Sequence, residues 1–430
     1  MRSRQLVAMI ALVLSPLAVQ SQERVASSDV ASRNAVVADS GAGTPTRSDT
    51  PVLPRSGAPA FREWESLTGE WSGVRTSLVN RGVTFGATYT HDVSNVLAGG
   101  ARRGSASRGL FMGEMRVDLS QARLKGTTAF VSYAAMRGSN GSALAGDIQA
   151  FSNVDADPFG HVYEAWIEQV AANGAIRLKI GRVDANTEYA VVAPAGEFIN
   201  ASAGFSPTIL GLPTYPDPEA SVNLFVTPAS WLMVSAGAFA GTFDPGTMGA
   251  TRVLDYFSIG EIATGWDRIW RAGAGKLAFG AWHHSGMAAR FDGGLTRGAD
   301  GWWASAEQRL AGQDATDDAP ASGIQVFGKY GSAPEMLSVF RQHVMAGFVF
   351  DGGVRRGSSD ALGVAVTHVD LSGIAAAATP HDETSVEFFY RVNVLGSVTL
   401  RPNVQYVVNP SGDPTRANAV VATLRTAIAF

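Results

Sequence analysis

The sequence predicts an all-β fold: a transmembrane antiparallel β-barrel of about sixteen strands, preceded by a short N-terminal helix. Three observations predict it. From about Val83 onward, apolar and polar residues alternate with a period of two. Short and long connections between the alternating segments follow one another in turn. An export signal stands at the N-terminus, and only 17% of the residues are charged, below the roughly 25% usual in a soluble protein.

The composition excludes several classes of protein. The 430 residues carry a formal net charge of −4, which gives no basic field for binding nucleic acid. The chain has no cysteine, so disulfides, thiolate metal sites and cysteine nucleophiles are excluded. Because lysine occurs at only four positions, nearly all positive charge is arginine, whose planar guanidinium donates directional hydrogen bonds. The lysines are Lys125, Lys179, Lys276 and Lys329.

The first 82 residues divide into three segments. Residues 1–21 have the basic start, the short apolar run and the small residues at a cleavage site near Ser21 that are typical of a secretory signal peptide. Residues 22–60 are rich in Ser, Ala, Thr, Pro and Gly without apolar periodicity, which predicts a disordered linker. Residues 61–82 form an amphipathic helical segment, because apolar residues recur there at steps of three and four. These residues are Phe61, Trp64, Leu67, Trp71, Val74 and Leu78.

Residues 83–430 form the predicted barrel. In the segment from Val386 to Val394, even-numbered positions are apolar, and odd-numbered positions carry Glu387, Arg391 and Asn393. Successive residues of a strand point to opposite faces, so each such segment has one apolar and one polar face. Most segments have eight to ten residues, the length of a tilted membrane strand. They centre near residues 87, 114, 130, 166, 179, 223, 236, 260, 278, 304, 327, 347, 364, 390, 404 and 424.

A soluble β-sandwich would show the same alternation, since each of its sheets has one wet face. The signal peptide, the low charge and the apolar C-terminal stripe that ends at Phe430 favour the barrel. We expect the last strand to pair with the first near Thr84 to Thr90, because an open edge in hydrocarbon leaves backbone groups unsatisfied. Aromatic residues near strand ends are expected to form interfacial girdles. They are Trp231, Trp282, Trp302, Trp303 and Tyr406.

Several stretches are similar to the carbohydrate-selective porins of the OprB type. The similarity extends over roughly residues 64 to 430, and its stretches lie at residues 67–75, 81–83, 163–169, 181–188, 204–208, 213–218, 387–391 and 409–412. The resemblance implies a sixteen-stranded barrel in the outer membrane of a Gram-negative bacterium. It implies passive diffusion of monosaccharides and similar small solutes.

The strands supply the groups that a wall for sugars needs. Sugars offer hydroxyls all round and weakly apolar ring faces, so planar donors, carboxylates and aromatic rings suit them. An arginine that faced lipid near the midplane would cost about 2–4 kcal/mol, so charged residues on these strands are expected in the lumen. The connection from Arg182 to Glu219 is rich in proline, which favours a stiff constriction loop over a mobile one. The candidate residues of the solute path are Arg116, Asp118, Glu164, Trp166, Glu168, Arg177, Lys179, Asp184 and Glu188.

Catalytic and metal-binding motifs are absent from the sequence. There is no Gly-x-Ser-x-Gly, His-Glu-x-x-His or phosphate-binding Gly-rich motif. His283-His284 and His381-Asp382 are isolated pairs, and the acidic turn with Asp314, Asp317 and Asp318 lacks the spacing of a calcium loop. We therefore expect no enzyme activity, no cofactor and no metal.

Two alternatives to a sugar porin stay open. One is a porin of broader selectivity, for small anions, polyols or aromatic acids. The other is a barrel with an enzymatic or secretion role. The expected partners are outer-membrane lipids, small polar solutes and the barrel-assembly machinery, which would read the C-terminal strand. The oligomeric state stays open.

Overall fold

The structure is a computed structural model that describes residues 65–241, 255–269, 272–313, 321–352, 359–374 and 382–430. The expected signal peptide, the expected linker and the acidic turn at 314–318 lie outside the described residues. Among the residues described, no helix is both long and apolar enough to cross a bilayer.

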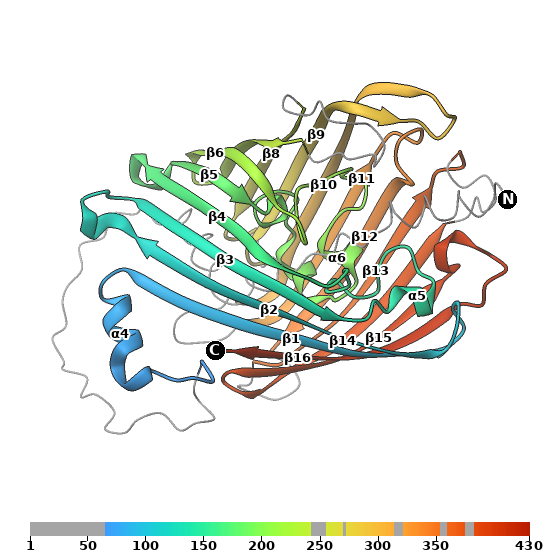
Figure 1. Cartoon of the computed structure of the whole chain (residues 1–430), viewed down its shortest axis with the longest axis horizontal. Coiled ribbons are helices and arrows are strands. Elements are labelled where there is room, and N and C mark those ends of the chain that lie inside the picture. The colour runs from blue at the N-terminus through green and yellow to red at the C-terminus, as the bar shows by residue number, and fades with distance from the viewer. Residues whose placement is uncertain (1–64, 242–254, 270–271, 314–320, 353–358, 375–381) are drawn as a thin grey trace.

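Sixteen strands form one closed antiparallel barrel, in which each strand pairs with its neighbours in the sequence (Figure 1). The centre of each of the sixteen segments expected from the alternation lies within one strand. The strands are β1 (Val83–Ala98), β2 (Gly104–Asp118), β3 (Thr127–Gly138), β4 (Phe159–Ala171), β5 (Ile176–Val183), β6 (Glu219–Ala229), β7 (Leu232–Ala240), β8 (Tyr256–Trp266), β9 (Gly275–Ala289), β10 (Leu295–Gln313), β11 (Ser322–Ser332), β12 (Phe340–Asp351), β13 (Ala361–Leu371), β14 (Glu383–Leu395), β15 (Val398–Val408) and β16 (Ala419–Ala429).

The barrel closes where it was expected to close. Strand β16 pairs with β1, with Ala429 opposite Thr88 and Ala427 opposite Thr90. The amide of Phe430 adds a hydrogen bond of 2.8 Å to the carbonyl of Ala87. Closure leaves neither the first nor the last strand with an unpaired edge, which a strand in hydrocarbon requires.

The short helices lie between strands or before the first one. They are η3 (Trp71–Gly73), α4 (Val74–Val79), η4 (Leu119–Ala122), α5 (Ser142–Ala145), η5 (Ala172–Gly174), η6 (Ala185–Thr187), η7 (Ala193–Glu197), α6 (Ala201–Gly204) and η8 (Pro410–Gly412). The expected helical segment before the barrel is thus shorter than the apolar stripe suggested. Gly69 and Gly73 adopt positive φ, which ends a right-handed helix on either side of η3.

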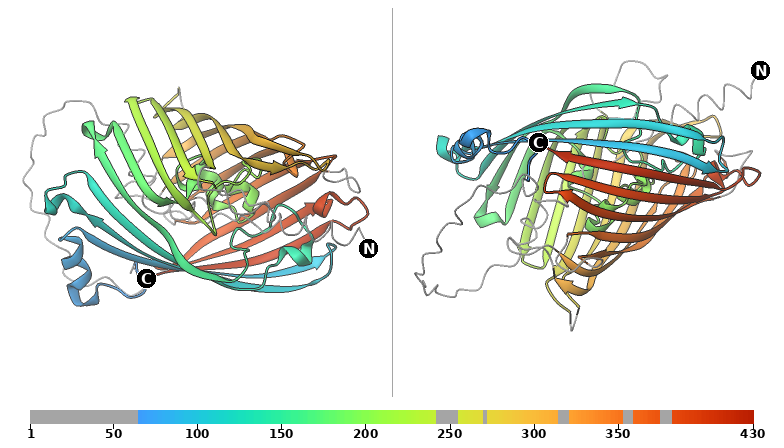
Figure 2. Two further views of the ribbon diagram at one scale, coloured as in Figure 1. Left: turned by 45° about the horizontal axis from the view of Figure 1, so that its top comes forward. Right: turned by 90° about the horizontal axis from the view of Figure 1, so that it is seen from below.

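The alternation places apolar side chains on the outer wall and polar ones inside. On β14, Phe388 is 47% exposed, whereas its neighbour Glu387 is 2% exposed. The inward groups are buried because two long connections fold into the barrel: residues 139–158 between β3 and β4, and residues 184–218 between β5 and β6. The green segment that includes α6, part of the second connection, lies within the ring of strands in the left view of Figure 2. The connections, rather than the strands alone, therefore shape the interior.

Two of the residues expected in the aromatic girdles point into the barrel instead of toward lipid. Trp282 and Trp303 are 2% and 0% exposed and lie inside the barrel, whereas Trp231, Trp302 and Tyr406 are exposed on the outer wall. Trp302 and Trp303 are consecutive in β10, so they cannot share a face. The indole of Trp303 lies over Gly280, where a Cβ would come within 2.0 Å of the ring. A position near a strand end therefore did not decide whether a tryptophan meets lipid.

Candidate functional site

The connection at residues 184–218, called here the constriction loop, crosses the inside of the barrel and is held by carboxylates of the wall. Glu261 on β8 accepts a hydrogen bond of 2.9 Å from the amide of Ala190. Glu307 on β10 accepts one of 2.8 Å from the amide of Ala193. Glu387 on β14 accepts from two consecutive amides of the loop, at Ile199 and Asn200. Buried backbone amides need such partners, so the wall fixes the course of the loop.

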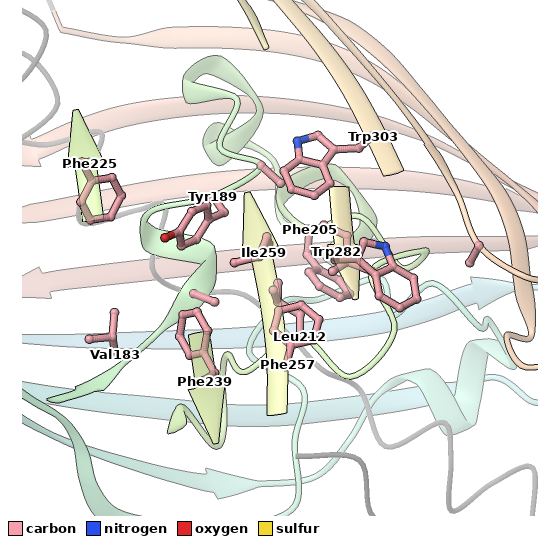
Figure 3. Packing of buried hydrophobic residues seen from close by; sticks show 14 of the residues in the cluster. Val183, Tyr189, Phe205, Leu212, Phe225, Phe239, Phe257, Ile259, Trp282 and Trp303 are labelled. Atoms are coloured by element: carbon pink, nitrogen blue, oxygen red, sulfur yellow. The ribbon is translucent and has the colours of Figure 1, made fainter. Parts of the chain in front are cut away.

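Apolar packing holds the same loop against strands β3 to β10. Tyr189, Phe205 and Leu212 of the loop pack with Phe257, Trp282 and other side chains of the wall in one buried cluster (Figure 3). The ring of Tyr189 also lies 5.8 Å from the ring of Phe225. The loop is therefore a packed part of the barrel interior.

Four charged residues form a compact arginine–glutamate cluster between the β4–β5 hairpin and the loop. The cluster consists of Glu168 on β4, Arg177 and Lys179 on β5, and Glu188 in the loop. Arg177 donates to Glu168 at 2.7 Å and to Glu188 at 2.6 Å. Lys179 lies 3.5 Å from Glu168 and also contacts Glu188. Two cations face two carboxylates, so the cluster carries no net charge.

Aromatic rings flank the cluster and form what we call the aromatic shelf: Phe130, Trp166 and Phe225. Phe130 and Trp166 stack with their centroids 4.7 Å apart. The Lys179 ammonium lies 4.1 Å from the centre of the Trp166 ring, and the Arg177 guanidinium lies 3.8 Å from that of Phe225. Such cation–aromatic contacts contribute about 0.5–2 kcal/mol each, and they hold the long basic side chains in one orientation.

Strand pairing brings these residues together. Arg116 on β2 is opposite Phe130 on β3, and Phe130 is opposite Trp166 on β4. The Arg116 guanidinium is 5.4 Å from the centre of the Phe130 ring and 5.5 Å from that of Trp166. Gly181 on β5 is opposite Trp166, and its φ of +139° together with a 2.2 Å approach of any Cβ to a backbone oxygen excludes a side chain there. Inward positions of adjacent strands thus build one continuous wall.

Exposure separates the members of this wall. The Arg177 side chain is 21% exposed, and Arg116 is half-buried. Trp166 and Lys179 are 5% and 2% exposed, so they lie behind the arginines. The two arginines are therefore the more accessible members of this wall, and the tryptophan, the lysine and the carboxylates are the buried ones.

Three of the nine predicted residues lie apart from the cluster. Glu164 and Asp184 hold the start of the constriction loop: Glu164 accepts from the amide of Asp184 at 3.2 Å. Asp184 accepts from the Thr214 hydroxyl at 2.6 Å and from Tyr163. Asp118 is exposed at the last position of β2, where its carboxylate accepts from the amide of Ser120 at 2.8 Å and begins η4. Arg116, Trp166, Glu168, Arg177, Lys179 and Glu188 are the residues that the structure brings together.

A bulge explains why Tyr163 and Glu164, although consecutive, both face the lumen. Ser132 on β3 pairs with Glu164, and Tyr133 pairs with Val162, so Tyr163 is an extra residue in β4. Tyr163 and Glu164 are 1% and 6% exposed. A bulge redirects side chains next to a site in this way, and it lets the Tyr163 hydroxyl donate to Asp184.

A second loop glutamate has a similar arrangement on the far wall. Glu197 accepts from Arg391 on β14 at 2.9 Å and from Arg401 on β15 at 3.0 Å. The Arg401 guanidinium lies 5.6 Å from the centre of the Phe389 ring. Sequence reasoning missed this triad. Both arginines lie on the polar face of an alternating strand, which was the available signal. Nothing in the sequence indicated that Glu197 contacts them.

The connection at residues 139–158 brings a further charged group that the sequence analysis did not identify. Arg425 on β16 forms a bidentate pair with Asp92 on β1, at 2.8 and 2.9 Å. Arg108 on β2 pairs with Asp155 of the connection. Ser152 also donates to Asp92 at 2.7 Å. These groups are buried and fasten the connection to the seam where the barrel closes.

A closed sixteen-stranded antiparallel barrel with an apolar outer wall, a polar interior and an inward loop defines a membrane channel of the porin class. The sequence profile described as "Carbohydrate-selective porin, OprB family" matches residues 102–430. The chain belongs to this family, whose members are outer-membrane porins.

Individual relatives agree with this assignment. Porin B of Pseudomonas aeruginosa is 23% identical over 422 aligned residues, which cover 85% of this chain and 91% of the relative. A high-pH structure of Pseudomonas putida OprB superposes with a TM-score of 0.77 at 18% identity, covering 86% of this chain and all of the other. A low-pH structure of the same protein gives a TM-score of 0.59 at 17% identity, covering 86% of this chain and 99% of the other. At identities this low, the two superpositions show that the fold is shared.

Proposed function

We propose that Arg116 and Arg177 form the sugar-contacting wall of the constriction in this carbohydrate-selective porin, with the aromatic shelf beside them. The observation that carries the proposal is the combination of exposure and fixation in Arg177. Its guanidinium is held by two carboxylates and an aromatic ring, yet part of its surface faces the lumen. A fixed planar donor binds hydroxyls without a large loss of side-chain entropy.

The neutral charge of the cluster supports passage of uncharged solutes. Two cations and two carboxylates cancel, so neither anions nor cations gain a large electrostatic advantage. Each hydrogen bond to a sugar hydroxyl contributes about 1 kcal/mol net, or somewhat more from a charged donor, because water competes. Weak binding of this order, in the millimolar range, lets a solute leave as readily as it enters. Transport is passive diffusion without chemical turnover.

The test is sugar block of ion current through the reconstituted full-length porin. Arg177→Gln and Arg116→Gln each remove one charged donor, so the sugar concentration for half-block should rise about tenfold. Trp166→Ala removes the support of both Arg116 and Lys179, and it should weaken block several-fold. Arg290→Gln is the matched control, because Arg290 pairs with nearby Asp292 in a connection distant in sequence from the site.

Other results of this test would show that the constriction lies elsewhere in the barrel. Unchanged block in Arg177→Gln and Arg116→Gln, together with lost block in Arg391→Gln or Arg401→Gln, would place the solute path at the Glu197 triad. Liposome swelling across monosaccharides, disaccharides and amino acids of similar size separates a sugar-selective pore from one of broader selectivity. Signal-peptide removal near Ser21 and reading of the C-terminal strand by the assembly machinery stay predictions.

A further inference from the structure

The helical segment before the barrel exposes large apolar side chains. Trp71, Val74 and Val79 are 41%, 51% and 50% exposed, and no residue of η3 or α4 is buried. Leu124, in the turn between β2 and β3, is 54% exposed. We call these four residues the rim patch. A short helix that buries none of its apolar residues against its own chain requires another environment for them.

The rim patch is fastened to the barrel rather than free. The amide of Leu67 donates to the carbonyl of Ala429 at 2.8 Å. The Gln121 side chain, in the same turn as Leu124, donates to the carbonyl of Asn80 at 2.9 Å. The helix and the turn are therefore joined near the C-terminal end of the helix, and Figure 1 shows α4 beside the near ends of β1 and β2.

The position of the rim patch relates it to the membrane. It lies at the end of the barrel that carries the short turns, which in outer-membrane barrels faces the periplasm. Phe85, near the start of β1, is 37% exposed and begins the lipid-facing band next to the helix. The patch therefore continues the apolar surface of the barrel into the interfacial region of the inner leaflet.

The polar residues around the patch suit a layer of phospholipid headgroups. The Arg75 guanidinium lies 4.6 Å from the centre of the Trp71 ring, and tryptophan with arginine is typical of the interface. Arg81, Arg123 and Lys125 are exposed where the helix meets the turn. Of the nearby acidic residues, Glu65 and Glu70 precede the helix, and Glu70 accepts a hydrogen bond from Thr76 at 2.7 Å. Asp118 caps η4 beside the three basic residues, so this end of the patch carries a net charge of +2. The basic groups therefore gather at one end of the patch.

We propose that the rim patch lies in the inner leaflet of the outer membrane and binds its phospholipids, with Arg81, Arg123 and Lys125 contacting anionic headgroups. The helix is an interfacial anchor, parallel to the membrane surface, that fixes the periplasmic end of the pore at a defined depth. The proposal rests on the barrel spanning the membrane and is independent of which residues contact the sugar.

The absence of cysteine allows a direct test in the full-length chain. Val74→Cys and Leu124→Cys would carry an environment-sensitive fluorophore in vesicles that contain brominated phospholipid. Thr76→Cys is the matched control, because residues two apart on a helix do not share a face. Quenching by brominated lipid should be several-fold stronger at positions 74 and 124 than at 76. Equal quenching at 74 and 76, or water-like emission at 74, would overturn the proposal.

Two further variants separate lipid from other occupants and test the charges. Deletion of residues 22–60 tests whether the N-terminal segment covers the patch. If lipid quenches the label at position 74 only after this deletion, the segment covers the patch and the proposal is wrong. Arg81→Gln, Arg123→Gln and Lys125→Gln combined should weaken quenching in phosphatidylglycerol vesicles and leave it unchanged in phosphatidylcholine vesicles. An equal effect in both lipids would contradict the role of the cations. Sugar block of the current should not change in any of these variants.

Discussion

Glu188 illustrates how one side chain sets both geometry and charge in the constriction. It contacts Arg177 and Lys179, and it is the only member of the arginine–glutamate cluster that comes from the loop. Without its charge, two cations would face the single carboxylate of Glu168. Charges about 4 Å apart interact by about 1 kcal/mol in water and about 4 kcal/mol at a partly buried site, so the change is large enough to alter ion flow.

Glu188→Gln should therefore make the pore prefer anions. The local charge of the cluster changes from zero to +1, and we expect the anion-to-cation permeability ratio to rise several-fold at low salt. The measurement is the reversal potential in a salt gradient across a planar bilayer. Asp292→Asn makes the same change of charge in the connection between β9 and β10, away from the cluster. Equal reversal potentials in the two variants would mean that the section of the pore that determines ion selectivity is not at Glu188.

Residues on neighbouring strands were the most predictable part of the site. Glu168 pairs with Lys179 in the β4–β5 hairpin, and a four-residue turn leaves little freedom in that register. Alternation then places Trp166 and Arg177 on the same inner face. The same rule also put Asp118 there, although it ends its strand and caps a turn instead. Alternation predicts on which face of a strand a residue lies, but it does not predict where the strand ends.

The connection at residues 139–158 depends on one strand carboxylate at its base. Glu383, the first residue of β14, accepts hydrogen bonds from the amides of Ile148, Gln149 and Ser411. Asp147 lies beside it. Burial raises the pKa of Asp147 well above its usual value of 3.8, and the neighbouring Glu383 and Asp155 carboxylates raise it further. The folded connection thus favours the protonated form of Asp147.

This pKa direction gives a pH dependence with a definite sign. Below pH 3.8 Asp147 is protonated in both the folded and the unfolded chain, so it does not disfavour folding. As the pH rises from there to the folded pKa, ionisation favours the unfolded chain, and the free energy of unfolding falls by about 1.4 kcal/mol per pH unit. Amide hydrogen exchange of residues 142–149 should therefore show a difference in protection across the pH range above 3.8, with weaker protection at the higher pH. Asp147→Asn should remove most of this difference, and an unaltered pH profile in that variant would assign it to another group.

The wall contacts that hold the loops inside the barrel could not be predicted from the sequence. Proline density indicated that residues 182–219 are stiff, but the carboxylates that hold this loop lie on β8, β10 and β14. Each of these is one polar residue among many on an alternating strand. Pairing of Glu197 with Arg391 and Arg401 depends on the path of the loop through space, which has no short-range signal. Trp282 and Trp303 were misassigned for the same reason, because they pack against this loop.

Closure of the barrel depends on the last three residues. Ile428 pairs with Tyr89 on β1 and with Val398 on β15, and Phe430 donates to the carbonyl of Ala87. Deleting residues 428–430 removes these bonds at the end of β16 and leaves the facing backbone groups of β1 and β15 unpaired, and each such group costs several kcal/mol in hydrocarbon. We expect this deletion to block assembly, measured as loss of heat-modifiable migration on gels. A chain that lacks residues 22–60 should assemble normally, and folded monomer in the first variant would contradict the prediction.

The wall groups that hold the constriction loop link the shape of the pore to the closure of the barrel. Glu261 and Glu307 hold the loop from β8 and β10, whereas Glu387 and the arginines that hold Glu197 lie on β14 and β15. In a barrel without β14, the amides at Ile199 and Asn200 have no partner on the wall. The constriction is therefore complete only when the ring of strands is complete, so a barrel that fails to close also lacks its narrowest section.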